Sequence, residues 1–209
     1  MAAEFIKLYE ENPQRTKIEH IVDVLKKGGV IIYPTDTIYG IGCDLFNRKA
    51  IDRVRRMKGI KPKKFNLSFI CNDISQVAEY VRRIDNQAFK VMKKSLPGPF
   101  TFIFEASSKV PKILETNKKT VGVRIPANNI PRDIVEVLGN PIVTSSIKAE
   151  DEVIEYTTDP ELIYDELKND IDLFIDGGYG GNIPSTVIDL SQGGFEVIRE
   201  GLGDIYEYI

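Results

Sequence analysis

A short apolar segment that ends abruptly at a proline constrains the fold more than any other feature of this sequence. Residues 30–33 read Val-Ile-Ile-Tyr, and Pro34 follows them directly. A run of β-branched and aromatic residues of this length predicts a buried strand that stops at a defined point. The segment behind it, residues 34–42, is expected to be a loop rich in hydroxyl groups, with Gly40 and Gly42 allowing a ligand to approach or the backbone to turn with positive φ. Loops of this kind bind ligands in α/β sheets, although a plain turn capped by threonines is the alternative.

Helical and strand patterns alternate through residue 175, and the strands after that point are hairpin-like. This order predicts an α/β fold with a twisted mixed parallel and antiparallel sheet and flanking helices, formed by residues 1–209 as a single domain. The expected helices are residues 15–27, 48–58, 75–82, 86–95, 131–138 and 159–168. The expected strands are residues 5–9, 30–33, 67–71, 100–105, 120–125, 141–146, 171–175, 185–190 and 195–199.

Charge is distributed unevenly along a chain whose net charge is only −3. Residues 48–64 contain nine basic side chains and one acidic one, whereas residues 150–176 contain eleven acidic side chains and one basic one. We expect the arginines of the helix at 48–58 to point outward, and one face to attract polyanions while another repels them. Two solvated charged helices without a partner are the alternative.

Several common classes of site are disfavoured by the composition. His20 is the only histidine, and we expect it to be a solvated or hydrogen-bonded surface residue rather than a triad member or metal ligand. Cys43 and Cys71 are too few for a disulfide framework, which favours the reducing cytoplasm. No apolar run approaches the length of a membrane span, and the N-terminal residues do not resemble a secretory signal. Residues 177–181 resemble a phosphate loop only in composition and are expected to form a turn.

Hydroxyl groups recur at strand ends, and cationic side chains lie near them in the sequence. A cavity lined by neutral donors and a few positive charges would suit a polyphosphate or a carboxylate. The hydroxyl residues are Thr35, Thr37, Thr101, Thr144, Ser145, Ser146, Ser185 and Thr186, and the cationic residues are Lys61, Arg124, Lys148 and Arg199.

The sequence resembles the YrdC-like family, whose best-known members are threonylcarbamoyl-AMP synthases, and it looks closest to the YciO-like branch. The resemblance rests on motifs that occur in the family's order over nearly the whole chain. They are YPTDTIYGIGCD at 33–44, PGPFTFIF at 97–104, VGVRIP at 121–126, PIVTSS at 141–146, PSTVIDL at 184–190 and VIREG at 197–201.

The resemblance implies the YrdC-like fold, in which the sheet and helices surround a deep concave cavity. It also implies a nucleotidyltransferase that joins L-threonine, bicarbonate and ATP, with Mg²⁺ accompanying ATP, and releases pyrophosphate. The product, threonylcarbamoyl-AMP, serves N6-threonylcarbamoyladenosine formation on tRNA. No resident metal site is implied.

By position in the family motifs, the resemblance implies three groups of site residues. Thr35, Thr37, Tyr39 and Ser185 would bind threonine. Thr101, Arg124, Thr144 and Arg199 would bind the nucleotide. Lys58, Lys61, Ser146 and Lys148 would act in catalysis.

The sequence departs from the synthase pattern at several of these positions. Lys61 replaces the arginine of the family's K-x-R motif, and the lysine of that motif corresponds to Gly59 or, after one inserted residue, to Lys58. Lys148 replaces the asparagine of the S-x-N motif. The alternative function is therefore a nucleotide-binding or double-stranded-RNA-binding protein that keeps the cavity without strong synthase activity. In that case Arg48–Lys64 would contact the backbone of tRNA or double-stranded RNA.

Overall fold

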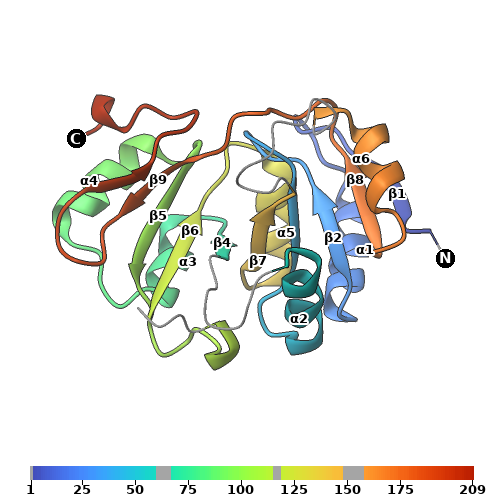
Figure 1. Cartoon of the computed structure of the whole chain (residues 1–209), viewed down its shortest axis with the longest axis horizontal. Coiled ribbons are helices and arrows are strands. Elements are labelled where there is room, and N and C mark those ends of the chain that lie inside the picture. The colour runs from blue at the N-terminus through green and yellow to red at the C-terminus, as the bar shows by residue number, and fades with distance from the viewer. Residues whose placement is uncertain (1, 60–66, 115–118, 148–157) are drawn as a thin grey trace.

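The computed structural model describes residues 2–59, 67–114, 119–147 and 158–209. A single mixed sheet runs through these residues, and the two termini lie at opposite ends of its long axis (Figure 1). The strands are β1 (Glu4–Lys7), β2 (Val30–Tyr33), β3 (Gly40–Asp44), β4 (Ser68–Ile70), β5 (Phe100–Glu105), β6 (Thr120–Arg124), β7 (Ile142–Ser146), β8 (Leu173–Asp176), β9 (Thr186–Asp189) and β10 (Glu196–Arg199). The helices are α1 (Arg15–Lys26), α2 (Arg48–Met57), α3 (Ile74–Tyr80), α4 (Asn86–Ser95), α5 (Asn129–Leu138) and α6 (Pro160–Leu167).

The strand order in the sheet is β1-β8-β2-β3-β7-β4-β6-β5-β9-β10. Strand β8 is parallel to both β1 and β2, β4 is parallel to β6, and β5 is parallel to β9. The remaining neighbours are antiparallel, including the hairpin of β9 and β10 at the end of the chain. The predicted mixed sheet with a final hairpin is confirmed.

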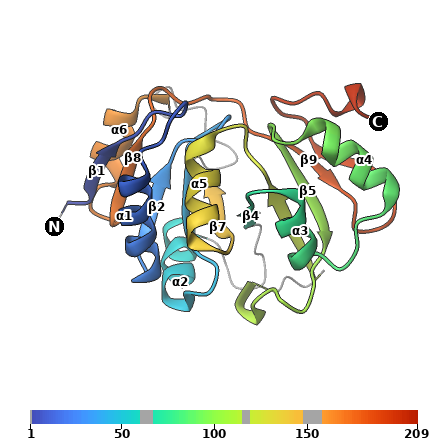
Figure 2. The ribbon, with the colours of Figure 1, turned by 180° about the vertical axis from the view of Figure 1, so that it is seen from behind.

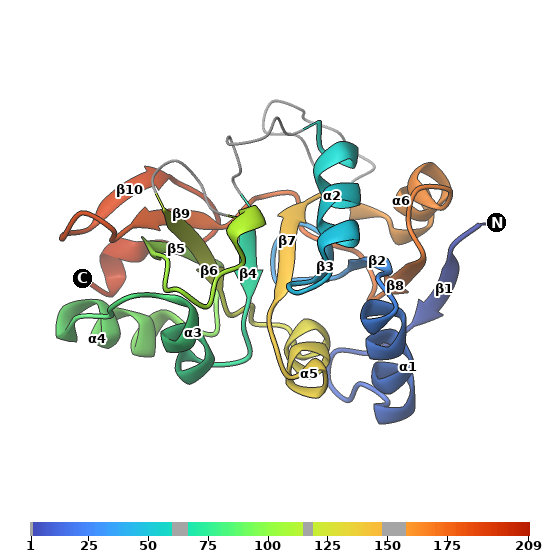
Figure 3. The ribbon, with the colours of Figure 1, turned by 90° about the horizontal axis from the view of Figure 1, so that it is seen from below.

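Helices cover both sides of the sheet. Helices α2 and α6 lie on one side in Figure 3, and α1, α3, α4 and α5 lie on the other side, where Figure 2 shows them in front of the strands. The first of two core clusters joins Ile51 of α2 and Val77 of α3 to Phe69 and Val143 in the middle of the sheet. Phe69 and Val143 are register partners that point to one face, so α2 and α3 pack on the same face of the twisted sheet, although they lie on opposite sides in Figure 3.

The second core cluster packs α1 and α5 on the strands at the N-terminal end of the sheet. Helix α1 buries Ile18, Ile21, Val22 and Leu25, the spacing that its sequence predicts. Helix α4 begins after Asp85, whose carboxylate accepts a hydrogen bond from the Ala88 amide, so the predicted N-cap is also confirmed.

One prediction about the segment after Pro34 is wrong. Gly40 and Gly42 do not lie in a loop but in strand β3, which pairs antiparallel with β2. Neither Gly40 nor Gly42 has positive φ. A Cβ on Gly40 would lie 2.9 Å from Cζ of Tyr33, and one on Gly42 would lie 2.6 Å from Cγ2 of Ile142. These glycines make room for neighbouring side chains of the sheet rather than for a turn.

Replacing Leu25 with alanine tests the second core cluster. Leu25 is fully buried, so Leu25→Ala should lower the free energy of unfolding by about 2–5 kcal/mol through lost contacts and a cavity. Leu162 on α6 is 51% exposed, and the matched Leu162→Ala variant should cost less than about 1 kcal/mol. Urea unfolding of both variants measures the two losses of free energy of unfolding. Equal losses would contradict the placement of Leu25 in the second core cluster.

Candidate functional site

The strand register places two of the predicted hydroxyl residues, Thr101 and Thr144, on one face of the sheet, whereas Ser145 and Thr186 alternate to the other face. Ser68 on β4 lies beside Thr144 on β7 and beside Gly122 on β6. On the neighbouring strands, Ile103 of β5 pairs with Gly122, and Thr101 of β5 pairs with Val187 of β9. We call the side of the sheet that carries Ser68, Thr101, Gly122 and Thr144 the polar face.

The polar face is less completely covered than the opposite face. Ile103 and Val187 on the polar face are only half-buried, whereas Phe102 and Ile188, which point to the other side, are fully buried in the core. Gly122 keeps the polar face flat, because a Cβ there would lie 2.6 Å from Oγ of Ser68 and 3.3 Å from Cγ2 of Thr101. Polar atoms at this part of the sheet are therefore placed next to partly accessible surface.

Residues 35–38 form a tight hydrogen-bonded turn after β2. The hydroxyl of Thr35 donates to the carbonyl oxygen of Ile38 at 2.8 Å and accepts from the amide of Thr37 at 3.0 Å. The two threonine hydroxyls lie 3.2 Å apart. Thr35 thus holds the shape of the turn, and the buried hydroxyl of Thr37 is the one directed toward β6.

A buried ion pair connects this turn to β6. Nη2 of Arg124 donates to Oδ1 of Asp36 at 2.8 Å and to Oγ1 of Thr37 at 3.1 Å. The other oxygen of Asp36 accepts from the amide of Ala127 at 3.1 Å. The side chains of Arg124 and Asp36 are only 12% and 10% exposed, and Nε of Arg124 is buried without a hydrogen-bond partner among the described residues. Asp36 therefore offsets the charge of Arg124 and fixes its guanidinium, while leaving Nε as an unused donor.

Asp36 was not among the predicted site residues, although it holds Arg124 in place. A carboxylate between two threonines directly after a strand was the available signal. Its partner could not be identified, because Arg124 lies on a strand separated from β2 by three others.

A second group of polar atoms lies at the start of β5 and β9. The hydroxyls of Thr101 and Ser185 are both buried and lie 2.8 Å apart. Arg199 donates through Nη2 to the carbonyl oxygen of Ser185 at 2.9 Å. A β-bulge between Val197 and Arg199 shifts the pairing of β10 with β9, so that Arg199 lies opposite Val187. The predicted association of Thr101, Ser185 and Arg199 is thus present as direct contacts.

Two further predicted binding residues, Tyr39 and Thr144, also have buried hydroxyls that are engaged within the protein. The hydroxyl of Tyr39 donates to the carbonyl oxygen of Gly178 at 2.7 Å and accepts from the amide of Gly177 at 3.1 Å. The hydroxyl of Thr144 is hydrogen-bonded to that of Tyr33. Burial raises the pKa of Tyr33 and of Tyr39, so both phenols keep their protons. In this structure Tyr39 joins the residues after β8 to those after β2, and Thr144 on the polar face is bonded to Tyr33 of β2.

The predicted catalytic residues are only partly within the described chain. Lys58 at the end of α2 donates to the carbonyl oxygen of Ile147 at 3.1 Å, which brings it to the end of β7. Ser146 is exposed on β7, where it pairs with Gly40 of β3. Lys61 and Lys148 lie outside the described residues.

The arginines of helix α2 were expected to point into solvent, but two of them are bound to other parts of the chain. Arg53 binds Asp172 at 2.6 Å and also donates to the carbonyl oxygen of Asp170. Arg55 pairs with Asp52, and its side chain is only 15% exposed. The predicted separation of a basic and an acidic face is therefore wrong at this point, because Arg53 pairs with a member of the acidic run. Residues 60–64 of the basic segment lie outside the described chain.

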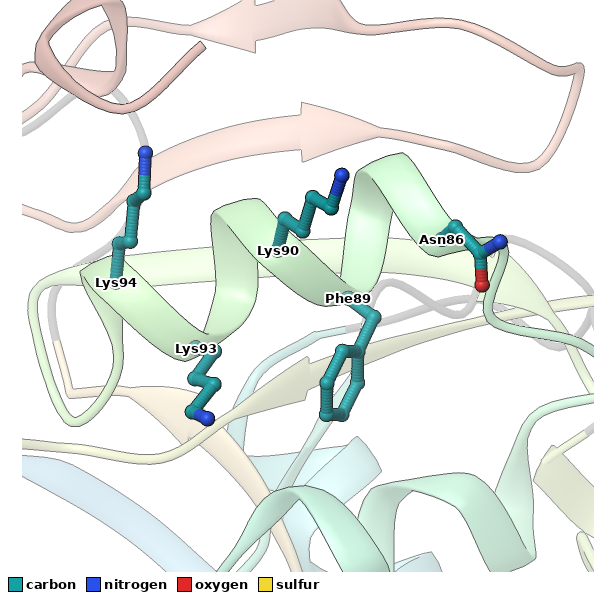
Figure 4. Close-up of a pocket in the computed structure, with 5 residues that line it drawn as sticks. All are labelled: Asn86, Phe89, Lys90, Lys93 and Lys94. Atoms are coloured by element: carbon teal, nitrogen blue, oxygen red, sulfur yellow. The ribbon is translucent and has the colours of Figure 1, made fainter.

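Other features bear on the predicted classes of site. His20 lies on the surface and is hydrogen-bonded to Glu4 at 2.8 Å, as expected. In the described part of the chain, no three His, Cys, Asp or Glu side chains gather in a way that could hold a metal ion. None of the described helices has the length and apolar character that a membrane crossing requires. Hollows lie along α4, away from the polar face, and the cavity expected beside Thr35 stays a prediction (Figure 4).

Comparison with known proteins adds sequence and structural relatives. A model of the Sua5, YciO and YrdC family, described as telomere recombination, matches residues 23–201. YciO of Escherichia coli K12 is 38% identical over 99% of this chain and 100% of its own, and an E. coli YciO crystal structure superposes with a TM-score of 0.91 over the same shares.

Relatives named for an activity or a ligand are more distant. A threonylcarbamoyl-AMP synthase of Coxiella burnetii is 30% identical over 87% of this chain and 96% of its own. The crystal structure of P. abyssi Sua5 complexed with L-threonine has a TM-score of 0.83 at 27% identity, covering 94% of this chain and 57% of that one.

Neutralising Asp36 tests the buried ion pair. Asp36→Asn leaves the Arg124 charge buried without an anion and should lower the free energy of unfolding by about 3 kcal/mol. The matched control is Glu79→Gln, because Glu79 and Lys109 also lie 2.8 Å apart but are more than half exposed. That variant should change stability by less than about 1 kcal/mol. Similar losses of unfolding free energy for the two variants in denaturant titrations would show that burial does not make the Asp36 ion pair contribute more than an exposed one.

Proposed function

Because the chain belongs to the Sua5–YciO–YrdC family, we propose that it is a threonylcarbamoyl-AMP synthase-like nucleotidyltransferase. Its substrates would be ATP, L-threonine and bicarbonate, and its product would enter the tRNA N6-threonylcarbamoyladenosine pathway. The name of the Coxiella relative and the threonine complex of P. abyssi Sua5 support this choice of reaction. The two buried free cysteines fit a reducing cytoplasm as its location.

The observation that carries the proposal is the grouping of buried hydroxyls and guanidinium groups beside the polar face. The hydroxyl of Thr37 accepts a hydrogen bond from Arg124. The hydroxyls of Thr101 and Ser185 are bonded to each other, and Arg199 donates to the carbonyl oxygen of Ser185. Neutral donors and cations held in fixed positions stabilise the negative charge that develops on a phosphate. These groups do so without gaining or losing a proton themselves. This set of groups fits nucleotidyl transfer better than acid–base chemistry, for which the histidine is remote and already hydrogen-bonded.

The proposed reaction proceeds in two bond-forming steps. The amine of threonine attacks the carbon of bicarbonate, and loss of water gives a carbamate. A carbamate oxygen then attacks the α-phosphorus of ATP, the bond between the α-phosphorus and the bridging oxygen breaks, and pyrophosphate leaves. Thr35, Thr37, Tyr39 and Ser185 would form the threonine side, with Thr35 and Tyr39 acting through the turn they hold. Thr101, Arg124, Thr144 and Arg199 would form the nucleotide side.

The pairing of Arg124 with Asp36 gives this arginine a different role from the other cations. Since Asp36 offsets the charge of Arg124, Arg124 would act mainly as an oriented donor. The other cations proposed to contact the triphosphate are Arg199, Lys58, Lys61 and Lys148. Mg²⁺ would arrive with ATP, held by phosphate oxygens and water, because the described residues offer no cluster of ligands for it.

The direct test is pyrophosphate release from the purified full-length chain with ATP, bicarbonate and Mg²⁺. We expect release that requires L-threonine and that forms one threonylcarbamoyl-AMP for each pyrophosphate, measured by mass spectrometry. Tight ATP binding without any threonine-dependent turnover would reject the synthase and favour a nucleotide-binding protein.

Ser185→Ala tests the role of the polar face in this reaction. The variant removes a hydroxyl that contacts Thr101, and one lost hydrogen bond to a substrate should lower kcat/KM for threonine about tenfold. Ser107→Ala removes a hydroxyl that bonds to the carbonyl oxygen of Glu79 beyond the far end of β5, and it should leave the rate unchanged. Equal rates in the wild type and Ser185→Ala, with both folded by circular dichroism, would remove Ser185 from the site.

A further inference from the structure

Cationic side chains gather on the exposed side of α4. Lys90, Lys93 and Lys94 all point into solvent, and Arg83 lies just before the helix. None of the four forms an ion pair with another residue in the described part of the chain. The helix itself contains no acidic residue. A positive patch of this kind stands out on a protein whose net charge is −3.

Acidic residues next to α4 in the sequence are already paired with other cations. Glu79 binds Lys109 at 2.8 Å, and Glu105 binds Arg82 at 3.2 Å. The carboxylate of Asp85 accepts the amide of Ala88 at the start of the helix, away from the lysines near its end. These carboxylates therefore do not neutralise the lysines of α4.

The same helix presents an aromatic ring beside these charges. A hollow of about 360 Å³ is lined by Asn86, Phe89 and the three lysines, and a second hollow along residues 83–87 shares Asn86 with it. Phe89 is 44% exposed. Figure 4 shows Phe89 and Lys93 pointing to one side of the helix and Lys90 and Lys94 to the other. The exposed ring thus shares its side of the helix with Lys93, and Lys90 and Lys94 lie on the other side of the same helix.

We propose that α4 is a binding surface for single-stranded nucleic acid. Ammonium groups contact backbone phosphates, and an exposed aromatic ring stacks with an unpaired base. A protein partner fits less well, since lysine is depleted at the centres of protein interfaces. A membrane fits less well too, because Phe89 alone offers little apolar area for insertion.

This surface is separate from the polar face and from helix α2. Val91 and Met92 of α4 pack into the same core as Phe102, on the side of β5 that points away from Thr101. A bound strand would therefore leave the proposed substrate site open. Arg53 and Arg55 of α2 have intramolecular carboxylate partners, whereas the α4 lysines have none in the described chain, so α4 is the better phosphate-binding helix.

The experiment measures fluorescence anisotropy of a labelled oligouridylate of about 12 nucleotides, within the usual site size, against the full-length chain at several salt concentrations. Lys90→Gln/Lys93→Gln/Lys94→Gln should weaken binding at least tenfold and reduce the slope of log K against log salt by about 2. Phe89→Leu should weaken binding about tenfold with little change in that slope. Neither variant should alter threonine-dependent pyrophosphate release, so the two proposals fail independently.

The matched control is Lys17→Gln/Lys26→Gln/Lys27→Gln, which removes the same charge at α1 and should change affinity less than twofold. Equal effects of the two triple variants would overturn the proposal, because they would indicate a response to net charge alone. Unchanged binding in Phe89→Leu, together with competition by polyglutamate as strong as that by unlabelled oligouridylate, would also overturn the proposal. These results would show that the surface binds any polyanion.

Discussion

A buried ion pair between two distant parts of the sheet organises the site. Asp36 follows β2 and Arg124 ends β6, and strands β3, β7 and β4 lie between them in the sheet. Burying two charges is favourable only when each is well paired and hydrogen-bonded, and here Asp36 also accepts the amide of Ala127. The position of Thr37 follows from this pair, since the same Arg124 nitrogen contacts its hydroxyl. The geometry of the turn after β2 is thereby tied to β6 rather than to its neighbours in sequence.

Local patterns in the sequence predicted most of the helices and strands. The bounds of β5 and α4 agree with the predicted residues 100–105 and 86–95, because apolar periodicity, a proline break and an N-cap all point to the same limits. Strand β3 was missed because its glycines look like turn residues. What they accommodate is the ring of Tyr33 and the methyl group of Ile142, which come from the flanking strands β2 and β7.

For the site, the sequence predicted which kinds of group would gather but not which atoms would touch. Hydroxyls at strand ends were expected to meet, and Thr101 and Ser185 do so although 84 residues separate them. A hydroxyl can bind a ligand only if no group of the folded chain already occupies it, and the sequence does not show which groups come close. The hydroxyl of Tyr39, for example, is bonded to the backbone of Gly177 and Gly178. The same reason explains α2, since a run of arginines in the sequence does not reveal that Asp172 lies beside Arg53.

The irregular pairing of β10 determines the direction in which Arg199 points. Ile198 is the additional residue of the bulge, so Arg199 aligns with Val187 and its guanidinium turns back to the carbonyl of Ser185. A regular continuation of the ladder from Val197 would instead place Ile198 opposite Val187 and turn Arg199 to the other face of the sheet. The loss of one regular pair at the edge of the sheet is therefore what directs this cation toward Ser185.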